Sequence, residues 1–282
     1  MQNSKVEGTN FPRNKHIRVG DKLIDLSTPV VMGIINLTPD SFYAASRSSD
    51  TQLLSRVEKM IQEGVKIVDI GGYSSRPGAE NIDSSEEIKR IVPSLDQLAK
   101  HFPELMVSLD TFRSEVAETG INHGARIIND ISGFSMDPNI VNVVAKYEVP
   151  YILMYMRGTP QNMSQFTDYK NIFNEMIFYF SAKIEQLQNA GVKDIIIDPG
   201  FGFSKTIEQN YFLLEHLEAF HVLGKPILAG LSRKSMIYKR LNCQPEDQKA
   251  LEGTIALNKI ALKKGASILR VHDVKEAIEL IS

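Results

Sequence analysis

The feature of this chain that most constrains its fold is a unit that recurs from Pro29 onward: an apolar strand, a polar loop, an amphipathic helix and often a glycine. The strand segments are continuous apolar runs rather than alternating ones, which is typical of parallel strands buried on both faces. Helical patterns such as NIFNEMIFYFSAKIEQLQNAG separate them. The predicted strands are VVMGII (30–35), VKIVDI (65–70), LMVSLD (105–110), ARIIND (125–130), YILMYM (151–156), DIIID (194–198), PILAGL (226–231) and SILRVH (267–272).

Strands that alternate with helices in this way allow two topologies, a closed (β/α)8 barrel or a doubly wound open sheet. An open sheet would be favoured by a G-x-G-x-x-G turn after the first strand, and the sequence has none there. Before the repeats, residues 16–26 (HIRVGDKLIDL) alternate around Gly20-Asp21, which indicates a small hairpin. We therefore predict an α/β fold, a (β/α)8 TIM barrel with a short N-terminal β-hairpin.

The chain of 282 residues fits one barrel, and it shows neither a composition break nor a linker rich in Pro, Gly or Ser. We predict a polar N-terminal segment at 1–15 and a single domain at 16–282. At the level of single turns, Ser84 with Glu87 resembles a capping box. Five glycines are predicted to end helices: Gly64, Gly124, Gly191, Gly224 and Gly265.

Charge and composition exclude several classes of partner. The net charge is −2, so the chain has no basic footprint for nucleic acid, and no polybasic stretch suggests a membrane surface. The N-terminus lacks the apolar region of a signal peptide, and no apolar run reaches the roughly 18 residues of a membrane span. Cys243 is the only cysteine, which favours a reducing compartment. We expect a cytoplasmic protein whose partners are small molecules.

Polar residues gather at the ends of the predicted strands, where parallel α/β folds bind their ligands. One such residue could cap a turn or the next helix, but capping is a poor joint explanation for six strand ends. Asp69 and Asp130 are the weakest candidates, because they could point between strand and helix and hold loops. The strand-end residues are Asn36, Asp69, Asp110, Asn129, Asp130, Asp198, Ser232, Arg233, Lys234, Arg270 and His272.

The residue types indicate two ligand chemistries. The set formed by Asp110, Asn129, Asp198 and Lys234 suits a flat heterocycle with an amidine-like edge, since a carboxylate accepts two parallel N–H bonds. Arg270 and His272, which lie on one face of a strand, suit with Asn36 an anion such as a diphosphate. No Ser or Cys nucleophile with an adjacent base is visible, and no cluster has zinc-site spacing. The loops at 36–47 and 71–81 are expected to cover the site.

Seven segments in order then resemble the signature segments of the dihydropteroate synthase family, and the resemblance covers nearly the whole chain after Pro29. The family resemblance implies that a dihydropterin-CH2 diphosphate and 4-aminobenzoate give 7,8-dihydropteroate and diphosphate, with Mg2+ assisting the leaving group. It also implies a homodimer and a sulfonamide target. The segments are GIINLTPDSF (33–42), DIGGYSSRPGA (69–79), SLDT (108–111), NDISG (129–133), DPGFGFSK (198–205), GLSRKSMI (230–237) and RVHDV (270–274).

By the same resemblance, each site residue has an implied role. C–O cleavage precedes attack, so Asp110, Lys234 and Arg270 are the implied catalytic residues, and Asp110 stabilises the developing cation. The pterin-binding residues are Asp110, Asn129, Asp198 and Lys234; the diphosphate-binding residues are Asn36, Arg270 and His272, with Asn36 also at the metal; and the aminobenzoate-binding residues are Ser75, Arg76, Pro77, Phe203 and Ser232. Arg233 is expected to support the site from outside it.

Several positions depart from the family pattern. Residues 43–46 (YAAS) replace an Asp-Gly pair, Tyr73 stands where Glu is common, and Ser75 stands where Thr is common. Tyr155 occupies the position of an expected His. Two alternatives share the barrel: a pterin-binding methyltransferase domain, and a non-catalytic pterin-binding protein. Neither would need the phosphate pair Arg270 and His272.

Overall fold

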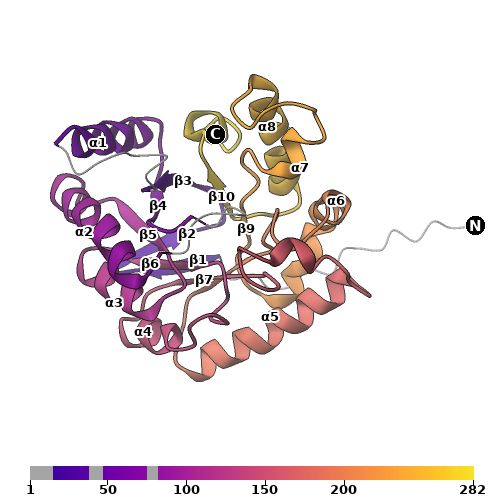
Figure 1. The fold of residues 1–282 in the computed structure, drawn as a ribbon, viewed down its shortest axis with the longest axis horizontal. Coiled ribbons are helices and arrows are strands. Elements are labelled where there is room, and N and C mark those ends of the chain that lie inside the picture. Colours follow the sequence, from indigo (N-terminus) through magenta and orange to yellow (C-terminus); the bar gives the residue numbers. More distant parts are fainter. Residues whose placement is uncertain (1–14, 38–46, 75–81) are drawn as a thin grey trace, which may run out of the picture.

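The computed structural model describes residues 15–37, 47–74 and 82–282, and this part of the chain forms a barrel of parallel strands inside a ring of helices (Figure 1). The strands follow the order β8-β7-β6-β5-β4-β3-β10-β9, and a bridge between Ile197 and Ile227 joins the two ends. The predicted (β/α)8 barrel is therefore confirmed. The strands are β3 (Val30–Asn36), β4 (Ile67–Gly71), β5 (Met106–Asp110), β6 (Ile127–Asp130), β7 (Tyr151–Met154), β8 (Ile195–Asp198), β9 (Leu228–Ala229) and β10 (Ile268–Val271).

The helices lie outside the barrel and bury one face each against it (Figure 1). In the long α5, the buried residues recur every three or four positions from Ile172 to Leu187, while Phe178 on the opposite face is 74% exposed. The helices are α1 (Arg47–Gln62), α2 (Ser84–His101), α3 (Ser114–Asn122), α4 (Ile140–Lys146), α5 (Ile172–Asn189), α6 (Ile207–Glu215), α7 (Ser235–Tyr238), α8 (Gln248–Lys263) and α9 (Val274–Ile278). Short 3-10 turns cover Met163–Gln165 and Leu217–Leu223.

The ends of the helices match the sequence in one respect and differ in another. All five glycines predicted to end helices have positive φ, from 64° at Gly224 to 108° at Gly124. The capping box predicted at Ser84 is wrong. Asp83, one residue earlier, accepts the N–H of Glu86 at 2.8 Å and caps α2. Glu87 instead turns inward, fully buried, and pairs with Arg113.

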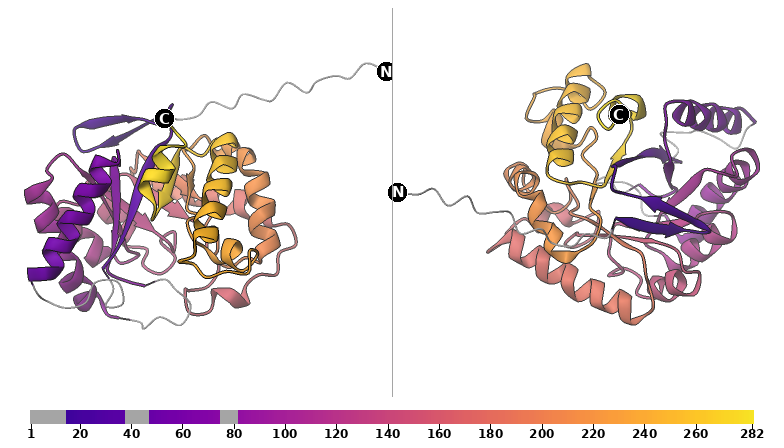
Figure 2. Two further views of the ribbon diagram at one scale, coloured as in Figure 1. Left: turned by 90° about the horizontal axis from the view of Figure 1, so that it is seen from above. Right: turned by 180° about the vertical axis from the view of Figure 1, so that it is seen from behind.

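A two-stranded hairpin, β1 (His16–Val19) and β2 (Lys22–Asp25), closes the amino-terminal end of the barrel (Figure 2). The predicted N-terminal hairpin is thus confirmed. Ile17 and Ile24 point from it into a cluster with the first residues of the barrel strands, among them Ile67 and Ile268. The alternation of the hairpin sequence produces this arrangement, because every second side chain faces the barrel. The site must therefore lie at the opposite end.

Ile17→Ala should lower the free energy of unfolding by about 2–5 kcal/mol, because it removes a side chain with no exposed surface from this cluster. Leu23→Ala is the matched control, since Leu23 lies in the same hairpin and is 69% exposed. Urea unfolding followed by circular dichroism measures both. Equal midpoints for the two variants would show that the hairpin does not seal the barrel.

Candidate active site

Four predicted strand-end residues form one connected polar group at the carboxyl end of the barrel. Arg270 of β10 donates from Nε to Asp69 Oδ2 at 2.5 Å and from Nη2 to Asp110 Oδ2 at 2.6 Å. Asn129 of β6 donates from Nδ2 to the same Asp69 oxygen at 2.9 Å. The side chains of Asp69, Asn129 and Arg270 point into the barrel, since strand residues alternate and the apolar residues two positions earlier belong to the inner cluster. Asp110 joins them through its bond to Arg270.

The two weakest candidates have different outcomes. Asp130 holds a loop, as expected: it accepts the N–H groups of Ser132 and Phe134 and the hydroxyl of Tyr151. For Asp69 the expectation of a loop-holding role is wrong. It is 1% exposed and lies inside the barrel between Asn129 and Arg270. Asp130 directly follows the site residue Asn129, so its side chain points to the opposite face of β6. Asp69 instead faces the barrel interior, as Asn129 does.

Two lysines lie near Asp198, Lys205 in the loop after β8 and Lys234 in the loop after β9. Asp198 accepts the N–H of Gly200 at 2.7 Å, and Lys234 donates to the carbonyl of Phe201. A side chain at Gly230 would meet both Lys234 Nζ and Asp198 Oδ2 within 4 Å, so glycine leaves the space between this pair open. Lys205, which was not among the predicted site residues, donates to the carbonyls of Gly200 and Phe203 at 2.9 Å each. The charge of Lys234 favours the ionised form of Asp198, so these two predicted pterin-binding residues lie close to each other.

Burial moves the pKa values of three of these groups toward 7. It raises the pKa of Asp110 to about 7, against the opposing charge of Arg270. It lowers the pKa of Lys234 to about 8 and that of Lys205 to about 7, in both cases against the attraction of Asp198. Three carboxyl groups (Asp69, Asp110 and Asp198) stand beside three basic groups (Lys205, Lys234 and Arg270) in this site.

His272 is neutral and is oriented by Ser232. Burial first, and then the charge of Arg270, lower the pKa of His272 to about 4. Ser232 Oγ lies 3.0 Å from His272 Nδ1 and accepts the backbone N–H of His272 at 3.2 Å. Nε2 is then the ring nitrogen available to a ligand, since no described residue bonds to it. Ser232 was predicted to contact aminobenzoate, and in the structure its hydroxyl supports the predicted anion-binding histidine.

The remaining predicted residues surround this group. Asn36 ends β3 beside Gly71 of β4. Phe203 places its ring 4.8 Å from Lys234 Nζ. Arg233 donates from Nε to Asp273 Oδ2 at 2.8 Å and from Nη2 to Asp273 Oδ1 at 2.9 Å. It thus supports the Ser232–Lys234 turn from outside the site. Ser75, Arg76 and Pro77 lie outside the described residues, as does the segment 43–46.

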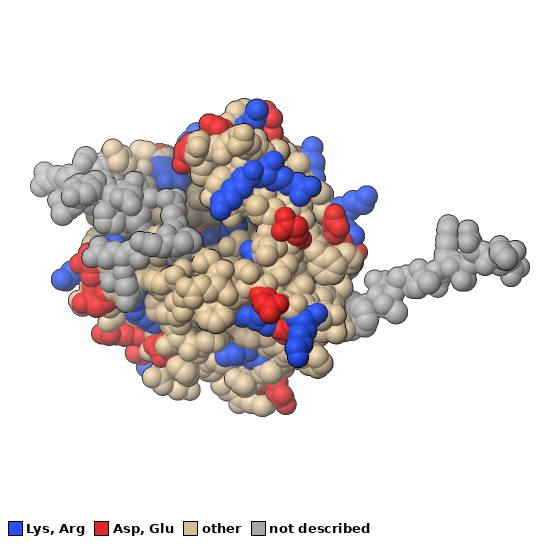
Figure 3. All heavy atoms as spheres, turned by 45° about the vertical axis from the view of Figure 1, so that its right-hand side comes forward, with Lys and Arg blue, Asp and Glu red and all other residues tan. Residues whose placement is uncertain are grey.

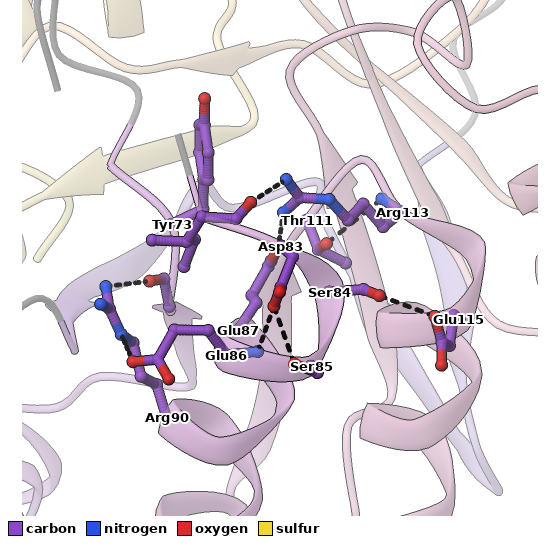
Figure 4. A network of polar contacts seen from close by, with 12 residues as sticks. Tyr73, Asp83, Ser84, Ser85, Glu86, Glu87, Arg90, Thr111, Arg113 and Glu115 are labelled. Carbon is purple, nitrogen blue, oxygen red and sulfur yellow. Dashed lines mark hydrogen bonds and ion pairs between the residues drawn. The ribbon is translucent and has the colours of Figure 1, made fainter. Parts of the chain in front are cut away.

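Two arginines hold the residues on either side of the second loop (Figure 4). Arg90 donates to the carbonyl of Gly72 at 3.3 Å, and Arg113 donates to the carbonyl of Ile82 at 2.6 Å. Arg113 also pairs with Glu87, whose pKa is raised by burial. These contacts fix the backbone where the loop leaves the barrel and where it returns to α2.

An apolar wall stands beside the polar group. It consists of Tyr73, Phe112, Ile131, Met154, Met156 and Met163, with Ile82 and Phe203 packed against it. Tyr73 meets Phe112 edge to face at 5.1 Å and accepts a hydrogen bond from Gln161 at 2.6 Å. A wall of this kind suits the faces of a flat ring whose edge meets the polar group.

Tyr155, which stands at the expected His position, points outward. Its ring packs on Tyr179 at 4.9 Å, in the layer between barrel and helices. Met154 and Met156 on either side belong to the apolar wall, because alternate residues of an extended segment face opposite ways. Tyr155 therefore adds no surface to the apolar wall, but the centre of its ring lies 5.0 Å from Nζ of Lys205.

The described residues contain neither a metal-ion cluster nor a membrane-spanning helix. No group of three or more His, Cys, Asp or Glu side chains among them could hold a metal ion. None of the described helices is long and apolar enough to cross a membrane. On the face shown in Figure 3, basic and acidic side chains are interspersed over an uncharged surface, and no broad basic field covers it.

Comparison with known proteins agrees with this geometry. The profile of the pterin binding enzyme family matches residues 32–272. The chain is 41% identical to a dihydropteroate synthase of Escherichia coli over 91% of this chain and 90% of the relative, and 42% identical to that of Synechocystis over 93% and 91%.

Solved structures show the same fold. The dihydropteroate synthase of Yersinia pestis in complex with a sulfonamide drug matches with a TM-score of 0.88 and 39% identity, over 94% of this chain and 96% of that one. The enzyme of Xanthomonas albilineans with 4-aminobenzoic acid matches with a TM-score of 0.86 and 34% identity, over 95% and 96%. The chain belongs to the pterin-binding enzyme family, among the dihydropteroate synthases.

Proposed function

We propose that this chain joins a (7,8-dihydropterin-6-yl)methyl diphosphate to 4-aminobenzoate, giving 7,8-dihydropteroate and diphosphate, a transferase reaction of folate biosynthesis. The observation that supports this function best is the pairing of two subsites at one barrel mouth. One is a carboxylate-and-amide set beside an apolar wall, which suits a pterin. The other is Arg270 with the neutral His272, which suits a diphosphate.

The proposed contacts follow from these positions. Asp198 and Asn129 accept and donate along the polar edge of the pterin, and Lys234 neutralises Asp198 from the other side. Asp110 faces the reacting methylene, and Arg270 with His272 Nε2 binds the diphosphate. Phe203 would contact the aminobenzoate, and Ser232 serves it only through the turn that also carries Lys234. The roles of Ser75, Arg76 and Pro77 in aminobenzoate binding stay predictions from the sequence. Sulfonamides, as aminobenzoate analogues, would compete there.

The proposed chemistry begins with cleavage of the bond between the methylene carbon and the diphosphate oxygen. The bonding electrons leave with the diphosphate, and the positive charge spreads into the pterin, where the Asp110 carboxylate stabilises it. The amine nitrogen attacks this carbon and then loses a proton to water. An aniline-type nitrogen is already neutral at pH 7, which explains why the site needs no strong base.

Mg2+ is the proposed cofactor. Asn36 would supply an amide oxygen at the end of β3, a hard donor of the type that Mg2+ prefers. Mg2+ usually keeps several water ligands and binds substrate phosphates, so one or two protein donors are enough for it. When bound, the ion neutralises charge on the leaving diphosphate. A diphosphate adds negative charge to this site, which supports the proposal that a cation accompanies it.

Turnover with the two substrates and Mg2+ tests the function directly. The purified protein should release diphosphate and form dihydropteroate, and EDTA should stop the reaction because the leaving group then lacks its counter-ion. Diphosphate release measured by a coupled assay, with omission of 4-aminobenzoate as the control, gives the result. Absence of product with verified substrates would refute the proposal.

The pH dependence of kcat/KM should be bell-shaped with its maximum between the pKa values of Asp110, about 7, and Lys234, about 8. Asp110 must be ionised to stabilise a cation, so activity falls as pH drops through its raised pKa. Lys234 must be charged to neutralise Asp198, so activity falls as pH rises through its lowered pKa. Initial rates at low substrate and constant ionic strength provide the profile. An acid limb near pH 4 would contradict these roles.

A homodimer is also proposed, through the helices after the seventh and eighth strands. Ile260 of α8 and Leu241 after α7 are 38% and 42% exposed and supply apolar surface on this side. Analytical ultracentrifugation tests it. A cytoplasmic location stays a prediction from the single cysteine, Cys243.

A further inference from the structure

The buried carboxylate of Asp69 connects the two subsites. It lies in β4, two strands from Asn129 in β6 on one side and two strands from Arg270 in β10 on the other. One of its oxygens, Oδ2, accepts from both. Asp69 thus links a residue of the pterin subsite to a residue of the diphosphate subsite. Because Asp69 is only 1% exposed, neither ligand would contact it directly.

Arg270 divides its guanidinium between two carboxylates. Nε is held by Asp69 at 2.5 Å and Nη2 by Asp110 at 2.6 Å. A single arginine more often gives both of these N–H groups to one carboxylate. Here the contact with Asp69 anchors Arg270 to a residue that both subsites share. The contact with Asp110 lies at the proposed reacting position.

The two contacts differ in access. The side chain of Asp69 has no exposed surface, whereas that of Asp110 is 19% exposed and that of Arg270 is 18% exposed. A ligand at the mouth can therefore reach the Arg270–Asp110 contact but not the Arg270–Asp69 contact. It brings replacements for both partners: pterin N–H groups for Asp110, and phosphate oxygens for Arg270.

We propose that Asp69 is a positioning residue that keeps Arg270 anchored by Nε while Nη2 exchanges Asp110 for the diphosphate of the entering pterin. The inference rests on the proposed function. The exchange breaks no covalent bond and moves no proton. Its effect is that Asp110 is released from its counter-ion only when a diphosphate is present, so the carboxylate is freed for the developing cation at the time the leaving group is bound.

The electrostatics of the site agree with this exchange. Arg270 stabilises the charged form of Asp110, while Asp69 and the burial of the site act against it. Loss of the Arg270 contact without a new donor would leave a buried carboxylate unpaired, which is unfavourable. A pterin that lacks the diphosphate has nothing to offer Nη2, and the Asp110 contact then persists.

The test compares the binding of two ligands by isothermal titration calorimetry: the dihydropterin diphosphate, and the 6-hydroxymethyl dihydropterin that lacks phosphate. Asp69→Asn retains the shape and one acceptor for Asn129 but loses the charge that anchors Arg270. We expect affinity for the diphosphate ligand to fall about 10- to 100-fold, the effect of a lost charge-assisted hydrogen bond. Affinity for the phosphate-free ligand should change by less than about threefold, and kcat should fall while KM for 4-aminobenzoate stays constant.

Asp130→Asn is the matched control. Asp130 is equally buried and hydrogen bonded, but it holds the loop after β6 and faces away from the barrel interior. Its substitution should leave the ratio of the two affinities unchanged, even if stability falls. A purely structural role for Asp69 predicts the same result for both variants, and equal losses for the two ligands in Asp69→Asn would overturn the inference.

A double-mutant cycle shows whether Asp69 acts through Arg270. Arg270→Lys removes Nε as a donor to Asp69. If Asp69 works by holding that atom, Asp69→Asn should cause no further loss of diphosphate affinity in the Arg270→Lys background. Additive losses would contradict the proposal.

A measurement on the wild-type protein keeps the inference testable even if the variants fail to fold. In protein labelled with 15N-arginine, the Nε–H resonance of Arg270, assigned from its absence in Arg270→Lys or by backbone correlation, should persist unshifted when the diphosphate ligand is added. Movement to the position of a free guanidinium would overturn the inference. If wild-type protein binds neither ligand, the proposed function fails instead, so the two failures are distinguishable.

Discussion

Asp198→Asn should abolish measurable turnover and weaken pterin binding by on the order of 100-fold or more. The substituted amide can still accept the N–H of Gly200 at its Oδ1 position, so the loop after β8 should hold its shape. The other carboxylate oxygen, Oδ2, is replaced by an NH2 group. This group is a donor at the place where the pterin also presents N–H donors. The buried ammonium groups of Lys205 and Lys234 also lose their shared counter-ion.

Calorimetry with the phosphate-free pterin isolates this effect, because that ligand depends on the pterin subsite alone. Asp21→Asn serves as the control, since Asp21 is exposed in the hairpin at the far end of the barrel. It should bind as the wild type does. If Asp198→Asn retained wild-type affinity, the heterocycle would not bind at the end of β8.

Arg270→Ala should weaken binding of the diphosphate-bearing pterin by about 100-fold or more, and binding of the phosphate-free pterin much less. It should also destabilise the fold by about 3–5 kcal/mol, because Asp69 and Asp110 lose the cation between them. Titration of each ligand and urea unfolding measure the two consequences separately.

Arg126→Ala is the control for Arg270→Ala, since Arg126 is exposed and precedes β6 at the amino-terminal end of the barrel. Neither ligand affinity nor the unfolding midpoint should move appreciably. An equal loss of affinity for both pterins in Arg270→Ala would remove Arg270 from the anion subsite.

The fold could be predicted from the sequence because the pattern that encodes it is local and repeated. Each buried strand is a short apolar run, and each helix presents a stripe with a period of about 3.6 residues. Strand bounds were correct to within two residues for most of the barrel. The main departure is β9, where only Leu228–Ala229 pairs as a regular strand, although the N–H of Ile268 still bonds to the carbonyl of Ile227.

Part of the site could be predicted from the sequence because the carboxyl ends of parallel strands meet at one end of the barrel. Asp110, Asn129, Asp198, Arg270 and His272 were found by that rule alone. The role of Asp69 was missed because a strand buried on both faces gives no sign of which residues point inward. The register supplies this information: Asp69 follows Ile67 by two positions as Asn129 follows Ile127, and both isoleucines belong to the inner cluster.

Lys205 was missed for a different physical reason. Its partners are carbonyls of a loop in which Gly200, Gly202 and Ser204 all have positive φ, between 47° and 83°. Loop conformations of this kind depend on the groups that hold them, and no periodic pattern encodes them. A lysine within such a glycine-rich turn is the one signal that the sequence offered.

The hairpin under the barrel has a consequence for the order of events during catalysis. With Ile17 and Ile24 filling the amino-terminal end, both substrates and both products must pass through a single entrance. The proposed pterin contacts lie on the strands themselves, at Asn129 and Asp198, whereas the proposed aminobenzoate contact Phe203 lies on the loop after β8. Since the strand ends lie deeper in a barrel than the loops that follow them, we expect an ordered mechanism in which the pterin diphosphate binds first.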